Sequence, residues 1–313
     1  MMWYHYLLIV IIGIIFIVLL TSFICFMMTF YSKKEVLSKE DNFTLPDDEI
    51  YESYRDTIIS DIKYARSLNG TSVSITSFDG LTLRGKYYEF DKDAPIEILF
   101  HGYKGNSERD MSTGVRRVFE CKRNALIVDQ RASGYSDGRV ITFGIKERFD
   151  ALSWANYVSK NYPNNKIILT GVSMGASTVV MASALNLPKN VIGILADCGF
   201  SNPSDIIKST IKQMKLPVKV FYPFVKMGAR IFGRFNLEET SPIEEIKKTK
   251  LPIIFIHGNK DKIVPFEMSK LMYENCNSKK ELVEINNGAH GITYLQEPVI
   301  YVDSLIDFFK DLI

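Results

Sequence analysis

The sequence predicts an α/β protein: a mostly parallel, doubly wound sheet with an antiparallel N-terminal edge, preceded by one membrane helix. Three observations predict this class. An unbroken apolar run occupies Leu7–Phe30, an Asp79-Gly80 dipeptide separates two β-rich runs, and short apolar runs then alternate with helical patterns. Continuous apolar runs of about five or six residues are typical of strands buried on both faces of a parallel sheet.

The first 32 residues contain no Asp, Glu, Lys or Arg. At about 1.5 Å per residue, a helix over Leu7–Phe30 is long enough to cross the roughly 30 Å hydrocarbon layer. A cleaved signal peptide would need a basic n-region and a small-residue cleavage site, and neither is evident. We therefore expect residues 1–32 to form an uncleaved, single-pass anchor in the lipid bilayer.

The side of the membrane stays open. Lys33, Lys34 and Lys39 follow the span and no Lys or Arg precedes it, so the positive-inside rule favours a cytoplasmic domain. Short N-terminal anchors also hold domains outside the cell, and the two alternatives are not separated by the sequence.

Residues 33–70 are expected to form a linker and an amphipathic helix, Asp47 to Leu68, and residues 71–313 the α/β domain. Ser72–Phe78 and Leu81–Phe90 form a hairpin around Asp79-Gly80. The buried strands follow at 96–100, 125–129, 166–171, 191–197, 251–258 and 281–285. The intervening helices include Glu147–Asn161 and Ala176–Leu185, and the last helix is Val299–Leu312.

Residues 203–250 interrupt this alternation and are expected to form a small helical cap over the C-terminal edge of the sheet. Its apolar face is expected to pack over the active site (Ile206, Ile207, Ile211 and Met214). Its cations recur at helical spacing: Lys208, Lys212, Lys215, Lys219, Lys226, Arg230 and Arg234. This basic stripe is either an ordinary solvated helix face or a surface that contacts anionic lipid.

Composition excludes several classes of protein. A net charge of +2, from 38 Lys and Arg against 36 Asp and Glu, does not favour nucleic-acid binding. Four scattered cysteines are too few for a disulfide framework or a zinc cluster. No metal and no organic cofactor is expected, and the oligomeric state is not determined.

The chemistry centres on Gly171-Val172-Ser173-Met174-Gly175, which follows the strand KIILT and precedes a helix rich in small residues. This context is that of a nucleophile elbow, in which a sharp turn presents the serine above a helix N-terminus. Ser173 is therefore the candidate nucleophile.

A serine nucleophile needs a base, and the base needs an acid that orients it. Of the four histidines, only His290 lies late in the chain, between the final strand and the final helix. Asp261 follows a buried strand and is the candidate acid, with Asp197 as the runner-up; Asp303 fits a solvated helix position. His101 and His257 each end a strand and are expected to be structural.

The oxyanion hole needs two backbone donors. We expect the N–H of Met174, directly after the nucleophile, and the N–H of Tyr103 in the loop after strand 96–100.

Over residues 70–313 the sequence resembles the α/β-hydrolase superfamily. The resemblance rests on five segments in order: HGYKGN, DQRASGYSDG, GVSMG, HGNKDKIVP and NGAHG. It is similar to the bacterial membrane-anchored branch grouped with serine aminopeptidase-type (S33-like) hydrolases. The resemblance implies Ser173, Asp261 and His290 as the triad and Tyr103 and Met174 as the oxyanion amides. Ala132 departs from the glycine that many relatives carry after D-x-R, and Asp129 and Arg131 are expected to brace loops.

The favoured hypothesis is a membrane-anchored serine hydrolase that cleaves a carboxylic ester or a related acyl bond. A peptidase or an acyltransferase could use the same triad, and a non-catalytic, membrane-tethered binding protein is the remaining alternative.

Overall fold

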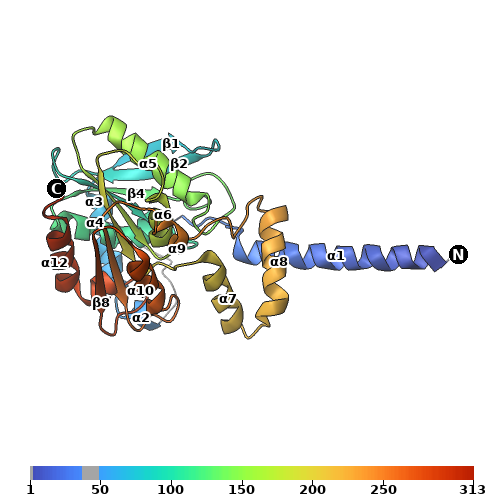
Figure 1. Ribbon diagram of the computed structural model, residues 1–313. Coiled ribbons are helices and arrows are strands. Elements are labelled where there is room, and N and C mark those ends of the chain that lie inside the picture. Colours follow the sequence, from blue (N-terminus) through green and yellow to red (C-terminus); the bar gives the residue numbers. More distant parts are fainter. Residues whose placement is uncertain (1–2, 37–48) are drawn as a thin grey trace.

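The computed structural model describes residues 3–36 and 49–313, and in these ranges one eight-stranded sheet forms the centre of the molecule (Figure 1). The strands lie in the order β1-β2-β4-β3-β5-β6-β7-β8. Their bounds are β1 Thr71–Thr76, β2 Thr82–Tyr88, β3 Ile96–Phe100, β4 Asn124–Asp129, β5 Ile167–Val172, β6 Val191–Asp197, β7 Ile253–Gly258 and β8 Lys280–Ile285. Each strand that the sequence predicts is present, with ends shifted by at most two residues.

The antiparallel N-terminal edge is confirmed. β1 pairs antiparallel with β2, and β2 pairs antiparallel with β4, whereas every later pair is parallel. The β1–β2 turn spans Ser77–Leu81, and Gly80 takes a positive φ of 89° there, which glycine adopts without steric cost.

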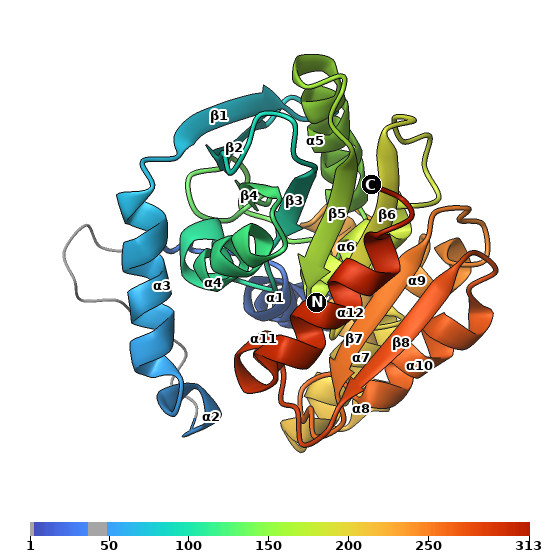
Figure 2. The ribbon, with the colours of Figure 1, turned by 90° about the vertical axis from the view of Figure 1, so that its left-hand side faces the viewer.

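Helices cover both faces of the sheet, as a doubly wound fold requires (Figure 2). One face carries α3 (Arg55–Ser67), α4 (Ser107–Glu120) and α12 (Pro298–Phe309), and the other carries α5 (Glu147–Asn161), α6 (Met174–Ala182) and α10 (Phe266–Asn275). Shorter helices are α2 (Glu49–Glu52), α9 (Pro242–Glu245) and α11 (Thr293–Gln296).

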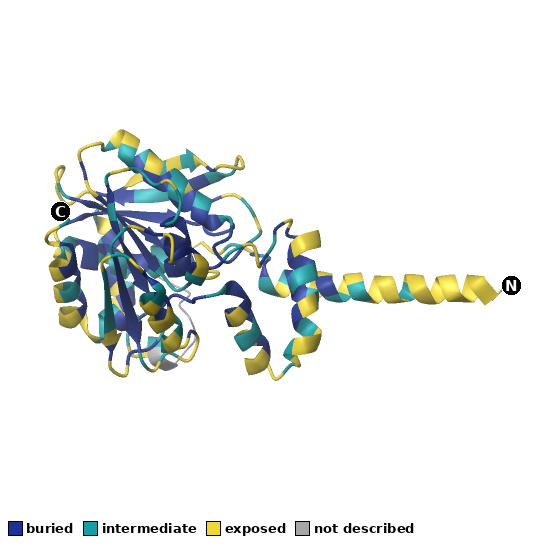
Figure 3. Cartoon of the chain, viewed as in Figure 1, coloured by how far each residue is buried: buried dark blue, intermediate teal, exposed yellow. Residues whose placement is uncertain are grey.

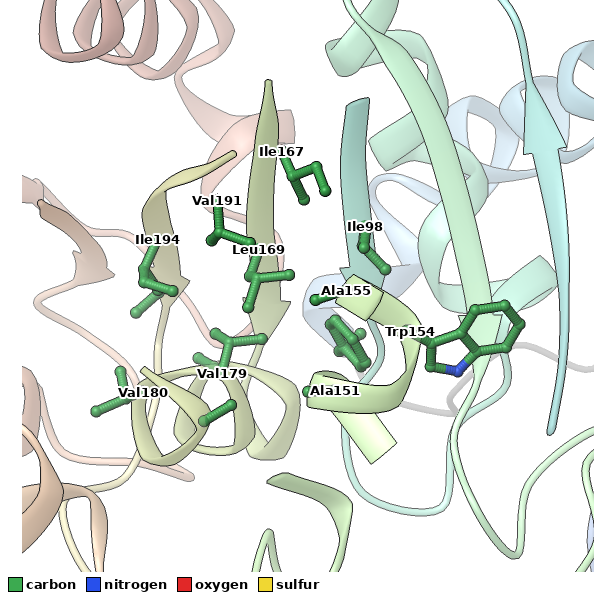
Figure 4. Close-up of a cluster of buried hydrophobic side chains, with 14 of the residues drawn as sticks. Ile98, Ala151, Trp154, Ala155, Ile167, Leu169, Val179, Val180, Val191 and Ile194 are labelled. Atoms are coloured by element: carbon green, nitrogen blue, oxygen red, sulfur yellow. The ribbon is translucent and has the colours of Figure 1, made fainter. Parts of the chain in front are cut away.

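The two layers follow from the alternation of side chains along each strand. On β3, Ile98 and Phe100 join the cluster under α5 and α6, whereas Leu99 joins the cluster under α4. Trp154 of α5 is fully buried in the first cluster, to which Ile98 and Leu169 of the sheet also belong (Figure 4). The central strands therefore bury both faces, which is why they read as unbroken apolar runs.

The expected helix Asp47–Leu68 is two helices, α2 and α3, that are separated by a turn at Ser53-Tyr54. Its first residues, Asp47 and Asp48, lie outside the described residues. α3 packs on α4 through Ala65, and its Arg66 pairs with Glu108 of α4 at 2.8 Å.

The N-terminal apolar run forms a single helix, α1 (Trp3–Thr29), which projects from the body of the molecule (Figure 1). Its side chains are largely exposed up to Leu20, and buried positions begin at Ser22 (Figure 3). Phe30, just beyond its end, is completely buried. Among the described residues, α1 is the one helix long and apolar enough to cross a membrane.

Residues 203–250 form α7 (Pro203–Gln213), α8 (Val218–Ile231) and the short α9. Asn202 caps α7 by accepting from Ser204 N, and Pro203 takes the first helical position, where no N–H is needed. α8 crosses α1 nearly at a right angle (Figure 1). Ile206, Ile207 and Ile211 lie in one apolar cluster with Met174 and with Phe26 and Phe30 of the α1 end, but Met214 is exposed.

Candidate active site

Ser173 stands at the turn between β5 and α6, with φ 56° and ψ −118°. Such a conformation is strained for a residue with a side chain and persists only where the surroundings enforce it. The flanking glycines allow the turn: a Cβ on Gly171 would lie 2.2 Å from the Gly175 backbone, and one on Gly175 would lie 2.0 Å from Phe100 O. The spacing of the motif is thus fixed by contact between backbones.

His290 reaches Ser173 from the loop after β8. Its Nε2 lies 2.9 Å from Ser173 Oγ, and its Nδ1 lies 2.6 Å from Asp261 Oδ2. Because a carboxylate only accepts, Nδ1 carries the proton that is donated to Asp261, and Nε2 presents its lone pair to the serine hydroxyl. The three side chains, from three separate loops, form one continuous hydrogen-bonded chain.

The Asp261 carboxylate is fully buried and has four donors. Its Oδ1 accepts from the backbone N–H groups of Ile263 and Val264, at 2.8 and 2.9 Å. Its Oδ2 accepts from His290 and also from His257 Nε2, at 3.1 Å. Burial opposes ionisation, but the hydrogen bonds from both histidines outweigh it and hold the pKa of Asp261 well below its usual range.

His257 is a member of this network that the sequence did not reveal. The ring is completely buried at the end of β7, and its Nδ1 lies 2.7 Å from Ser269 Oγ. Its Nε2 faces two acceptors, Asp261 Oδ2 and Val264 O, so this nitrogen carries the proton. The signal in the sequence was its place in the segment HGNKDKIVP, four residues before Asp261.

The runner-up acid, Asp197, is not joined to His290. It ends β6, and its Oδ2 accepts from Thr293 Oγ1 and Tyr301 Oη, both at 2.9 Å. Burial raises the pKa of this carboxyl, so it favours the protonated form more than Asp261 does. Asp303 is exposed on α12.

The loop after β3 passes beside the nucleophile. A Cβ on Gly102 would lie 3.5 Å from Ser173 Cβ, so the residue before Tyr103 lies next to the nucleophile. Met174 opens α6, where the backbone N–H groups lack intrahelical acceptors. His101 fixes this loop: it is buried, its Nδ1 lies 2.8 Å from Gly102 O, and its Nε2 accepts from Gln130 N.

Asp129 and Arg131 hold the neighbouring loops, as the sequence suggested. Asp129 accepts from Ser107 N and Tyr135 N, and Arg131 makes two-pronged ion pairs with Asp79 and Asp150. Ala132 has a φ of 61°, which lies in the left-handed region that glycine adopts without steric cost.

A cavity of about 320 Å³ opens beside Ser173 and His290. Its wall includes Tyr51 of α2, whose hydroxyl donates to His290 O at 3.2 Å, and Arg109 of α4. Much of the remaining lining is apolar, including Ile58, Leu99, Met111, Val172 and Leu295. Sequence reasoning did not assign Tyr51 or Arg109 to the site, because neither lies in a recognisable motif.

Ligand atoms of Cys198, Asp261 and His290 lie within 4.8 Å of one another. Burial raises the pKa of the Cys198 thiol well above its ordinary value, which disfavours the thiolate that a metal would need. Asp261 and His290 already bond to each other and to Ser173. This cluster is thus explained without a metal.

Fold and site together define an α/β hydrolase. The BD-FAE family model matches residues 115–276, about half of the chain, and the chain belongs to this family within the α/β-hydrolase superfamily. It is similar to the uncharacterized protein YqkD of Bacillus subtilis, with 26% identity over 77% of this chain and 80% of the relative. Protein bem46 of Schizosaccharomyces pombe is 27% identical over 71% of this chain and 70% of its own length.

Among solved structures, the Pyrococcus furiosus esterase Pf2001 superimposes with a TM-score of 0.65 at 23% identity. The match covers 90% of this chain and 99% of the esterase. At this level of identity the similarity shows a shared fold, and function has to be argued from the site itself.

Proposed function

We propose that this protein is a membrane-anchored serine hydrolase that cleaves carboxylic esters through an acyl-enzyme on Ser173. The observation that carries the proposal is the chain Ser173–His290–Asp261, with 2.9 and 2.6 Å between bonded atoms, at a strained turn above a helix N-terminus. The structural relatives include an esterase, which supports this proposal.

In the proposed reaction, Ser173 Oγ attacks the ester carbonyl while His290 Nε2 takes the hydroxyl proton. The N–H groups of Tyr103 and Met174 stabilise the oxyanion, and His290 returns the proton to the departing alcohol. Water then attacks the acyl-enzyme, again giving its proton to His290, and the acid product leaves with Ser173 restored. Asp261 orients the ring and stabilises its protonated form throughout.

Membrane anchoring by α1 is part of the proposal. The exposed length of the helix argues against a core helix. Cleavage as a signal sequence would remove Phe26 and Phe30, both buried against the cap, and would uncover an apolar surface. The protein is therefore proposed to keep this helix.

The test is labelling of the full chain in detergent micelles by a fluorophosphonate, beside Ser173→Ala, followed by hydrolysis of a chain-length series of p-nitrophenyl esters. We expect Ser173→Ala to abolish labelling and to lower kcat by about 10⁴–10⁶. Ser209→Ala, on the cap helix α7, is the matched control and should retain both.

A folded parent that neither labels nor turns over any ester would contradict the proposal and favour a binding protein. Cleavage of peptides alone would instead favour a peptidase. Transfer of the acyl group to an added alcohol would favour an acyltransferase.

A further inference from the structure

A second cavity, of about 420 Å³, lies where α1 meets the body of the molecule. The apolar part of its lining comes from Phe23, Ile24, Met27 and Met28 at the end of α1 and from Tyr31 just beyond the helix. The polar part of its lining consists of Ser32, Lys33, Lys34, Glu35 and Lys104. We call this cavity the anchor groove. It is apolar along the helix and cationic at its rim.

The position of the anchor groove follows from the burial pattern of α1. Nearly all side chains from Trp3 to Thr21 are exposed, a length of about 28 Å at 1.5 Å per residue. This length matches the roughly 30 Å hydrocarbon layer, so Ser22 and the residues after it lie at the headgroup level. The anchor groove would then open directly to lipid.

Two consecutive residues line the anchor groove and the cavity at Ser173. Tyr103 lines the catalytic cavity and Lys104 lines the anchor groove. The Tyr103 hydroxyl donates to Thr29 O at 2.6 Å, and Lys104 Nζ donates to Met28 O at 3.0 Å. These carbonyls belong to the last turn of α1, which has no intrahelical donors for them. Glu35 at the groove lies 3.4 Å from Arg109 at the catalytic cavity.

We infer that the substrate is an acyl ester carried by a bilayer lipid, which reaches Ser173 from the membrane along the anchor groove. This inference rests on the proposed function. An acyl chain that slides from the bilayer along Ile24 and Met28 stays in contact with apolar surface and avoids water. The exposed ammonium group of Lys33 at the rim suits an anionic headgroup, whereas those of Lys34 and Lys104 donate to Ser136 O and Met28 O. Tyr103 is 37% exposed, and release of its hydroxyl from Thr29 O would let the side chain move and join the two cavities.

The test compares two substrates with the full chain reconstituted in phosphatidylcholine vesicles. One is water-soluble p-nitrophenyl butyrate, and the other is a fluorogenic C16 ester embedded in the bilayer. Ile24→Trp and Met28→Trp fill the groove. Ile17→Trp is the matched control, because it lies on the same face of α1 as Ile24, two turns further into the membrane, and is 63% exposed.

We expect both groove substitutions to lower turnover of the bilayer ester at least fivefold more than turnover of butyrate, and Ile17→Trp to leave both rates at the parent level. Vesicles with 30% phosphatidylglycerol should raise turnover of the bilayer ester. An equal effect on both substrates, or no effect on the bilayer ester, would overturn the inference. Butyrate hydrolysis and fluorophosphonate labelling by the parent separate this result from failure of the proposed function, since both report Ser173 without lipid entry.

Discussion

At the residue scale, the geometry of the site depends on the hydrogen bonds that each polar atom makes. Asp261 accepts from two backbone N–H groups, from His290 and from His257, so its carboxylate has little freedom to rotate. A hydrogen bond to a charged group contributes about 1.5–3 kcal/mol. His257 is therefore a positioning residue, which acts on the reaction through Asp261.

Replacing His257 by leucine removes this donor while retaining bulk. We expect kcat for a soluble ester to fall about 10- to 100-fold with little change in KM, because the orientation of the base is lost while the cavity is intact. His257→Gln can still donate and should restore part of kcat. Steady-state kinetics of both variants measure the difference; equal rates would show that His257 serves packing alone.

At the element scale, α1 and α8 pack closely against each other. Phe232, at the end of α8, packs edge-on against Phe23 of α1 with ring centroids 5.1 Å apart. A Cβ on Gly228 would lie 2.5 Å from Ser22 O and 3.0 Å from Phe26 Cβ. Close approach of the two helices thus requires glycine at this position.

We expect Gly228→Ala to push α8 away from α1 and to destabilise the protein by about 1–3 kcal/mol, the usual cost of overpacking. The thermal midpoint of the full chain in detergent measures this. Gly13→Ala is the matched control, because no atom lies within 4 Å of a Cβ there. A midpoint unchanged by Gly228→Ala would mean that the helices do not pack as described.

The basic stripe of the cap divides into two groups. Lys208 and Lys226 flank the Tyr222 ring and pair with Asp205 and Glu238, at 3.3 and 2.5 Å. The others lie exposed and form no ion pair with described residues: Lys212, Lys215, Lys219, Arg230 and Arg234. Since α8 crosses α1 nearly at a right angle (Figure 1), we propose that the exposed group contacts anionic headgroups.

At the scale of the whole molecule, a buried ion-pair network ties the sheet to its helices. Glu97 on β3 is completely buried and binds Arg117 of α4 at 2.6 Å and Arg123 at 2.5 Å. Arg123 in turn donates to Leu305 O of α12. Burial opposes ionisation of Glu97, but the two guanidinium groups outweigh it and hold its pKa at about 2.

The low pKa of Glu97 makes stability depend on pH. The unfolded state binds the proton first, near pH 4.5, so the stabilisation is complete above that pH and is lost as the pH falls toward 2. The shift corresponds to about 3 kcal/mol. Glu97→Gln leaves two buried cations without a counter-charge and should cost about 3–5 kcal/mol at pH 7.

Denaturant unfolding of the full chain between pH 5 and pH 3 measures this effect. The parent should lose stability over this range, and Glu97→Gln should lose less. Exposed Glu274→Gln is the control and should follow the parent. Parallel pH dependence in all three proteins would show that Glu97 is not the group responsible.

The sequence by itself determined the strands, the hairpin, the apolar helix and the order Ser173, Asp261, His290. Each of these is a local pattern: buried strands read as apolar runs, Asp-Gly favours a turn, and backbone contact around Ser173 requires Gly171 and Gly175. Such patterns depend on neighbours in the chain, so they can be read without the fold.

Only the tertiary structure decided which distant groups meet. It joined Asp261, and not Asp197, to His290, and it added His257 to the same carboxylate. It also brought Tyr51 to His290 across 239 positions of the chain and placed the end of α1 against Tyr103 and Lys104. These contacts arise from the packing of whole elements, and hydrogen bonds between groups so far apart leave no periodicity in the sequence.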